Sequence, residues 1–109
     1  MVKFEELKTA VKAVGLETER VEEQHYLEGV FLKNKLQDIA LRLESSLGAA
    51  QKEFSRQAQE AVSGFGGIAK GQTLYYCQEG PSFIFAMLWP WQDGERVTVK
   101  MSKIPPVDI

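Results

Sequence analysis

The chain has 109 residues, of which 44% are hydrophobic and 26% are charged, and its formal net charge at pH 7 is −2. This length predicts one globular domain over residues 1–109, large enough to fold without disulfides or a structural metal. The slightly acidic balance excludes the basic excess that general nucleic-acid binding needs, so we expect no nucleic-acid partner.

The expected location is the cytoplasm. The N-terminal segment carries acids among its apolar residues, which argues against a signal peptide. Cys77 is the single cysteine, so no internal disulfide can form, as is typical of a reducing compartment. The longest apolar run, residues 83–91, is too short to span a bilayer as a helix. We therefore expect no membrane contact.

The first predicted element is an amphipathic helix over residues 3–14. Its apolar positions recur at spacings of three and four, at Phe4, Leu7, Val11 and Val14. Gly15 follows at the position where a left-handed residue commonly ends a helix.

Residues 17–32 predict one or two strands, with a turn near residues 24–25. Val30 and Leu32 occupy alternate positions, and Gly29 would weaken the interior of a helix. A helix over this segment is the alternative interpretation.

Two further helices are predicted in the middle of the chain. In the first, Asn34 and Gln37 have the spacing of a capping box, and Gly48 ends the helix. Its apolar stripe consists of Leu36, Ile39, Ala40, Leu43 and Leu47. The next helix is predicted from about Ala50 to the glycine-rich segment 64–67.

The remaining chain predicts three strands joined by two hairpins. The strand segments are TLYYC at 73–77, FIFAMLWPW at 83–91 and RVTVKM at 96–101. Asp93-Gly94 is a strong signal for a two-residue hairpin loop, which would place Trp89 opposite Thr98. A loop tip at residues 80–81 would likewise place Tyr76 opposite Phe85.

The predicted fold class is therefore α+β. We expect an antiparallel sheet with a C-terminal three-stranded meander, packed against about three helices in the order α-β(β)-α-α-β-β-β.

Because side chains alternate between the two faces of a sheet, this register predicts two different faces. One is an aliphatic core face with Tyr75, Cys77, Ile84, Ala86, Leu88, Pro90, Val97, Val99 and Met101. The other carries Leu74, Tyr76, Phe83, Phe85, Met87, Trp89 and Trp91 beside Arg96, Thr98, Lys100 and Ser102. We call this second set the aromatic face.

The aromatic face is too apolar to be left in water. Burying one large apolar side chain is worth about 1.5–3 kcal/mol, so five of them represent roughly 10 kcal/mol, comparable to the stability of a small domain. Three covers are open: the 17–32 strands or a helix of the same chain, a second copy of the chain, or another ligand or partner.

The leading functional hypothesis is a non-enzymatic interaction or self-assembly module, a homodimer or a binder of another protein. The candidate interface or ligand residues are Tyr76, Phe83, Phe85, Met87, Trp89, Trp91, Arg96 and Lys100. The alternative is a small-molecule binding protein or small enzyme, in which Trp89, Trp91, Arg96 and Lys100 line a pocket for a planar anionic ligand.

No residue pattern predicts catalysis, a metal or a cofactor. His25 is the single histidine and is better interpreted as a turn residue than as a metal ligand. Cys77 falls on the core face, where a thiol behaves as a small hydrophobe. The glycines of segment 64–71 follow a predicted helix instead of preceding one, which is the wrong order for a phosphate loop.

Overall fold

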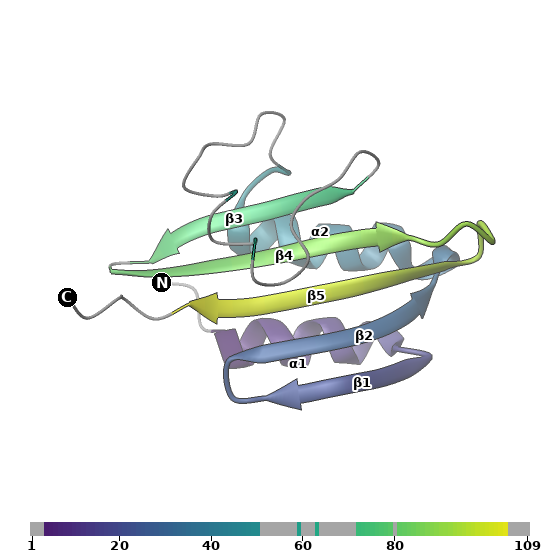
Figure 1. Cartoon of the computed structure of the whole chain (residues 1–109), viewed down its shortest axis with the longest axis horizontal. Coiled ribbons are helices and arrows are strands. Elements are labelled where there is room, and N and C mark those ends of the chain that lie inside the picture. The colour runs from purple at the N-terminus through teal and green to yellow at the C-terminus, as the bar shows by residue number, and fades with distance from the viewer. Residues whose placement is uncertain (1–3, 51–58, 60–62, 64–71, 80, 105–109) are drawn as a thin grey trace.

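The computed structural model describes residues 4–50, 59, 63, 72–79 and 81–104. These residues form a five-stranded antiparallel sheet with the strand order β1-β2-β5-β4-β3 (Figure 1). The elements are α1 (Phe4–Gly15), β1 (Thr18–Glu23), β2 (Tyr26–Leu32), a single 3-10 turn η1 (Lys33–Lys35), α2 (Leu36–Leu47), β3 (Thr73–Glu79), β4 (Ser82–Pro90) and β5 (Arg96–Ile104).

The α+β class is confirmed. The described residues contain two α-helices of known bounds. The third helix, predicted from about Ala50 to segment 64–67, lies almost entirely outside the described residues, and the two positions described within it, Gln59 and Ser63, are helical. The three C-terminal strands pair in sequence, β3 with β4 and β4 with β5, and β2 pairs with β5, so these strands are part of one five-stranded sheet and do not stand as a three-stranded unit.

Both described helices follow the predicted apolar stripes. In α1, Phe4, Leu7 and Val11 are buried, and Gly15 ends the helix with a φ of +119°. The buried side chains of α2 are Ile39, Leu43 and Leu47, and Gly48 follows with a φ of +86°. Each helix has 12 residues, and no described helix is long and apolar enough to cross a membrane.

The predicted capping box at the start of α2 is wrong. Lys33–Lys35 form a 3-10 turn, so the α-helix begins at Leu36 and its N-cap is Lys35, which makes no side-chain capping bond. Asn34 lies inside the tighter turn, where it is displaced from the cap position. The tertiary connection from β2 into α2 overrides this local signal.

Segment 17–32 is a β-hairpin, as the strand interpretation predicted. β1 and β2 pair antiparallel, with Glu23 opposite Tyr26 across the expected turn. The register shifts between Glu19 and Val21, so the β1 edge strand carries a bulge. Bulges and charged side chains on an edge strand discourage pairing with other chains.

The registers predicted for the three C-terminal strands are confirmed. Trp89 lies opposite Thr98, and Tyr76 lies opposite Phe85. The β4–β5 loop is longer than expected. A two-residue loop requires Glu95 to pair with Gln92, but the Glu95 N–H instead donates to Asp93 Oδ1 at 2.8 Å. The loop gains one residue from each strand, so the register of the remaining pairs is unchanged.

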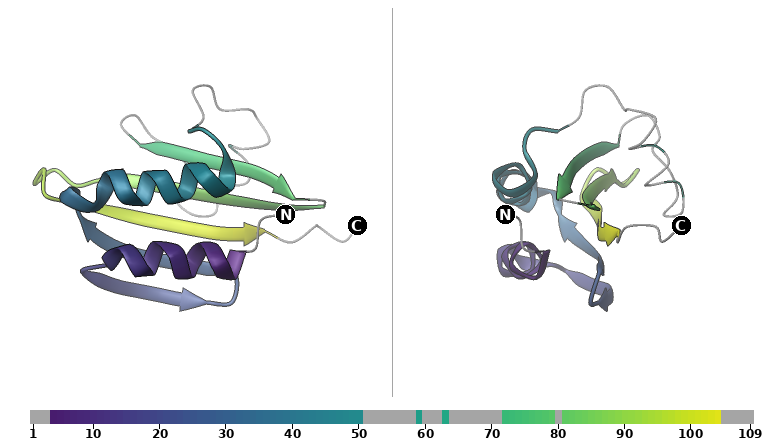
Figure 2. Two further views of the ribbon diagram at one scale, coloured as in Figure 1. Left: turned by 180° about the vertical axis from the view of Figure 1, so that it is seen from behind. Right: turned by 90° about the vertical axis from the view of Figure 1, so that its left-hand side faces the viewer.

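The main core lies between the sheet and the two helices. Both helices cover the same face of the sheet (Figure 2). The buried residues of this core include Leu27 and Phe31 of β2 together with Ile84, Ala86, Leu88, Val97, Val99 and Met101, so the predicted core face is confirmed. Pro90, at the end of β4, is the exception and is exposed.

The close contact between Gly29 of β2 and Leu16, which precedes β1, can be tested by mutation. A Cβ atom on buried Gly29 would lie 2.8 Å from Leu16 Cδ1 and 3.1 Å from the Thr18 carbonyl oxygen. We predict that Gly29→Ala lowers the free energy of unfolding by about 1 kcal/mol, because the Leu16 side chain must shift.

The measurement is urea unfolding of Gly29→Ala in the wild-type and Leu16→Ala backgrounds. The cost of Gly29→Ala should be smaller where Leu16 is already truncated, since contacting residues couple. Equal costs in the two backgrounds would contradict the proposed contact.

Candidate functional site: the aromatic face of the sheet

The face opposite the helices carries the predicted aromatic set. The confirmed register places Tyr76, Phe85, Met87 and Trp89 on this side, because directly opposed residues of an antiparallel pair share a face. β5 contributes Thr98 and Lys100 beside them. The sequence therefore located the face correctly.

The middle of the aromatic face is buried in the single chain. Leu74, Phe85 and Met87 are each 0% exposed and form their own apolar cluster, separate from the main core. Neither α1 nor α2 lies on this side, and the 17–32 strands belong to the same sheet. Of the covers left open from the sequence, the 17–32 strands and the two helices α1 and α2 are therefore excluded.

The candidate residues thus divide into buried and accessible ones. Phe85 and Met87 are fully buried, and Tyr76, Phe83, Trp89, Arg96 and Lys100 are partly buried. Trp91 is 37% exposed and lies at the end of the face, next to the β4–β5 loop. Trp91 is the most exposed residue of this set.

The Trp91 ring is held in place from three directions. Its Nε1 donates a hydrogen bond to Thr98 Oγ1 at 2.8 Å. The guanidinium carbons of Arg20 and Arg96 lie 5.6 Å and 5.9 Å from the ring centroid. Since Thr98 lies on β5 and Arg20 on β1, the indole reaches across the sheet from the end of β4.

Arg96 connects the β4–β5 loop to the start of β1. Its Nε donates to Glu17 at 2.9 Å, and its Nη1 lies 3.1 Å from Asp93 Oδ2. Asp93 Oδ1 also accepts the backbone N–H groups of Glu95 and Arg96. These hydrogen bonds, with the cationic Arg96 beside them, lower the pKa of Asp93.

A second aromatic–cation contact lies next to the buried cluster. Lys100 Nζ is 4.0 Å from the centroid of the Trp89 ring, within the range of a cation–π interaction. At the other end of the cluster, Tyr76 and Phe83 stack with their centroids 5.6 Å apart and their planes 19° apart. The planar side chains thus flank the apolar cluster on both sides.

Three polar residues of the N-terminal hairpin belong to the same face and were missed from sequence. Tyr26 Oη donates to Glu28 Oε1 at 2.7 Å, and Glu28 lies 3.6 Å from Arg20 and opposite Lys100. Burial, reinforced by the Glu28 carboxylate, raises the pKa of Tyr26. Only the β2–β5 pairing places them here, and no local pattern signals it.

His25 and Cys77, the other residues considered from the sequence, take part in backbone hydrogen bonding and core packing. His25 lies in the β1–β2 turn, where its carbonyl oxygen accepts bonds from Ser102 Oγ and Lys103 N, both at 3.0 Å. Cys77 is partly buried against the main core. Within the described part of the chain, no three metal-binding side chains gather. Segment 64–71 lies outside the described residues.

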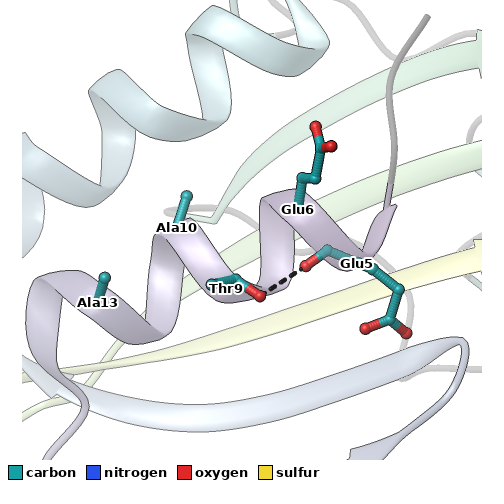
Figure 3. Close-up of a pocket in the computed structure, with 5 residues that line it drawn as sticks. All are labelled: Glu5, Glu6, Thr9, Ala10 and Ala13. Atoms are coloured by element: carbon teal, nitrogen blue, oxygen red, sulfur yellow. Dashed lines mark hydrogen bonds between the residues drawn. The ribbon is translucent and has the colours of Figure 1, made fainter.

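A surface hollow of about 370 Å³ lies elsewhere, along the outer side of α1 (Figure 3). It is lined by Glu5, Glu6, Thr9, Ala10 and Ala13. The Thr9 hydroxyl donates to the Glu5 carbonyl, so it is already used within the helix. The hollow shares no residue with the aromatic face.

Mutating each tryptophan in turn tests whether Trp89 is part of a buried cluster and Trp91 is not. Trp89 packs against the buried cluster, whereas Trp91 is 37% exposed. We predict that Trp89→Ala lowers the free energy of unfolding by about 3 kcal/mol and Trp91→Ala by about 1 kcal/mol. Chemical denaturation measures both values, and similar effects at the two sites would contradict the assignment.

Asp93 generates a test by pH. Its lowered pKa means that the carboxylate stabilises the fold above the ordinary aspartate pKa of about 3.9, and that this stabilisation is lost as the pH falls through the lower folded-state value. We predict that Asp93→Asn lowers the melting temperature at neutral pH. The difference from wild type should shrink near pH 2. A difference that is unchanged at low pH would show that charge is not its source.

Comparisons with known proteins add no relative from which a role could be inferred. No protein-family model matches this sequence, no curated protein matches it, and no solved structure matches its fold.

Proposed function

We propose that this chain is a non-enzymatic interaction module of the cytoplasm that self-associates through the Trp91 end of its aromatic face. The observation that carries this proposal is Trp91 itself, an indole that is 37% exposed yet fixed by Thr98 and flanked by two guanidinium groups. The cytoplasmic location rests on the single cysteine.

The physical argument starts from exposed apolar area. Leu32 lies opposite Arg96 on the neighbouring strand and is 40% exposed, so two accessible apolar side chains flank Arg96 at this end. Tryptophan and arginine are enriched among the residues that carry most of the binding energy in protein interfaces. An indole held in one orientation also loses little further conformational freedom when it is buried.

The charges at this end favour a second copy of the chain as the partner. Cationic Arg20 and Arg96 alternate with the carboxylates of Glu17, Glu28 and Asp93. A two-fold symmetric contact brings a patch against itself, so it needs both signs of charge within that patch. A patch with one sign would repel its own copy.

The alternative hypothesis is that Trp91 and Arg96 bind a planar anionic ligand. The ion pairs of Arg96 argue against this binding. Arg96 already binds Glu17 at 2.9 Å and Asp93 at 3.1 Å, so an anion would have to compete with both carboxylates. A protein partner can instead cover the indole and leave these pairs at the rim of the interface.

The test is the solution mass by light scattering over protein concentrations of about 1 to 100 μM, a range that brackets micromolar dimers. We expect wild type to approach twice 12.3 kDa as the concentration rises. Trp91→Ala should stay at the monomer mass at concentrations where wild type is dimeric, because it removes the central contact.

Leu41→Ala provides the matched control. Leu41 is 55% exposed, so it is also an accessible apolar side chain, but it lies on α2 behind the other face of the sheet. This variant should keep the wild-type mass. A monomer at every concentration of wild type, or equal losses in both variants, would contradict the proposal.

A further inference from the structure

In the β4–β5 loop, an aspartate is followed directly by a glycine. Asp93-Gly94 is the single Asp-Gly pair of the sequence, which contains no Asn-Gly pair. In such a pair the glycine nitrogen can attack the side-chain carbon Cγ of the aspartate, because glycine has no side chain to hinder the approach. The Asp93 side chain is 35% exposed, so water can reach it. The loop therefore contains the groups needed for an isomerisation of its own backbone.

The isomerisation needs only water and leaves the composition of the chain unchanged. The Gly94 nitrogen bonds to Cγ of the neutral, protonated Asp93 carboxyl group, and the nitrogen's proton leaves with the carboxyl hydroxyl as one water molecule. Water then adds to one carbonyl carbon of the five-membered imide and breaks that carbon's bond to nitrogen. Where the broken bond is the original peptide bond, the product is isoaspartate, whose main chain runs through Cγ and is one carbon longer.

The folded loop directs both reacting groups to other partners. Asp93 Oδ1 accepts the backbone N–H groups of Glu95 at 2.8 Å and Arg96 at 3.1 Å, and Asp93 Oδ2 accepts Arg96 Nη1 at 3.1 Å. The Gly94 N–H donates to the Trp91 carbonyl oxygen at 3.3 Å. The carboxylate is thus held toward the residues that follow Gly94, and the attacking nitrogen has its own acceptor.

The charges around the carboxylate act in the same direction. Arg96 is the cation beside Asp93, and it is itself fixed by Glu17 at 2.9 Å and approached by Glu95 at 3.8 Å. The hydrogen bonds from Glu95 and Arg96 lower the pKa of Asp93. Since the neutral carboxyl group is the form that is attacked, the folded loop contains less of it at neutral pH than an unfolded chain does.

We propose that Asp93 is a modification site that isomerises spontaneously to isoaspartate, at a rate controlled by Arg96 and by the two N–H groups of the loop. Isoaspartate carries its carboxylate on Cα in a longer main chain, so it cannot keep the present bonds to Glu95 and Arg96. Its formation would release the loop that holds Trp91 beside Arg96. The inference stands on this loop alone and does not depend on self-association.

The test follows isoaspartate formation during incubation at neutral pH, for wild type in buffer and in concentrated urea. A protease that cleaves before aspartate but not before isoaspartate, followed by mass spectrometry, measures the normal form at Asp93. We expect the folded chain to isomerise at least about tenfold more slowly, because unfolding removes the hydrogen bonds of the carboxylate. Asp38 is the internal control, since the side chain of Ile39 hinders the same attack in both samples.

Two arginine variants test the role of Arg96. Arg96→Ala should raise the rate in the folded chain about threefold, the factor expected for one exposed ion pair. Arg20→Ala is the matched control, because Arg20 also flanks the Trp91 ring, at 5.6 Å, but pairs with Glu28. This control should isomerise as wild type does. Circular dichroism verifies that both variants are folded, and the comparison in urea decides the proposal if Arg96→Ala is not.

A second readout reports the effect of the modification on the loop. The chain has two tryptophans, so nitrogen–proton NMR correlation spectra contain two indole signals. The isomerised protein should show a shifted Trp91 signal and an unchanged Trp89 signal. The proposal is overturned if unfolded wild type forms no isoaspartate, if folded and unfolded chains isomerise equally fast, or if folded Arg96→Ala and Arg20→Ala have the same rate. Isoaspartate that leaves the Trp91 signal in place would also overturn it.

Discussion

The pairing of β2 with β5 is the constraint on which the rest of the structure depends. It joins the N-terminal hairpin to the C-terminal strands, from Tyr26 opposite Ser102 to Leu32 opposite Arg96. Backbone bonds close both ends of the ladder, because Lys33 N donates to Glu95 O at 2.8 Å and Lys103 N donates to His25 O at 3.0 Å. Without this ladder the chain would hold the three C-terminal strands and a separate two-stranded hairpin, which is marginal in water by itself.

Once β5 occupies the centre of the sheet, side-chain alternation distributes the residues of every neighbouring strand. Val97, Val99 and Met101 point to the helices with Leu27 and Phe31, and together they form the main core. Thr98 and Lys100 point the other way, to the face that β4 supplies with aromatic rings. The same pairing carries Glu28 to a position opposite Lys100. The polar surroundings of the aromatic face are thus a consequence of the core arrangement.

The two tryptophans of the aromatic face have different surroundings. At the Trp91 end, Arg96 is engaged by Glu17 and Asp93, which suits a contact with a self-complementary protein surface. Trp89 packs against the buried cluster, and Lys100 lies over its ring and opposite Glu28 on β2. Trp91 Nε1 donates to Thr98, whereas Trp89 Nε1 is buried without a hydrogen-bond partner among the described residues.

The sequence by itself determined the two described helices, the three C-terminal strands with their two registers, and the location of the aromatic face, but it left segment 17–32 open between strands and a helix. These follow from local rules: apolar periods, the positive φ that Gly15 and Gly48 adopt, and turns that limit which residues can be opposite one another. Two local predictions failed, the cap at Asn34 and the two-residue loop at Asp93-Gly94. In both cases the conformation of the connecting turn differs from the prediction, while the pairing of the strands does not.

Only the tertiary structure decided which parts of the aromatic face are buried and which charges surround it. Arg20 and Trp91 are 71 residues apart in the sequence, so their 5.6 Å contact depends on the complete order of strands across the sheet. The burial of Trp89 Nε1 likewise depends on packing beyond its own strand. Side-chain alternation specifies a face, whereas the contacts on that face require every strand to be in place.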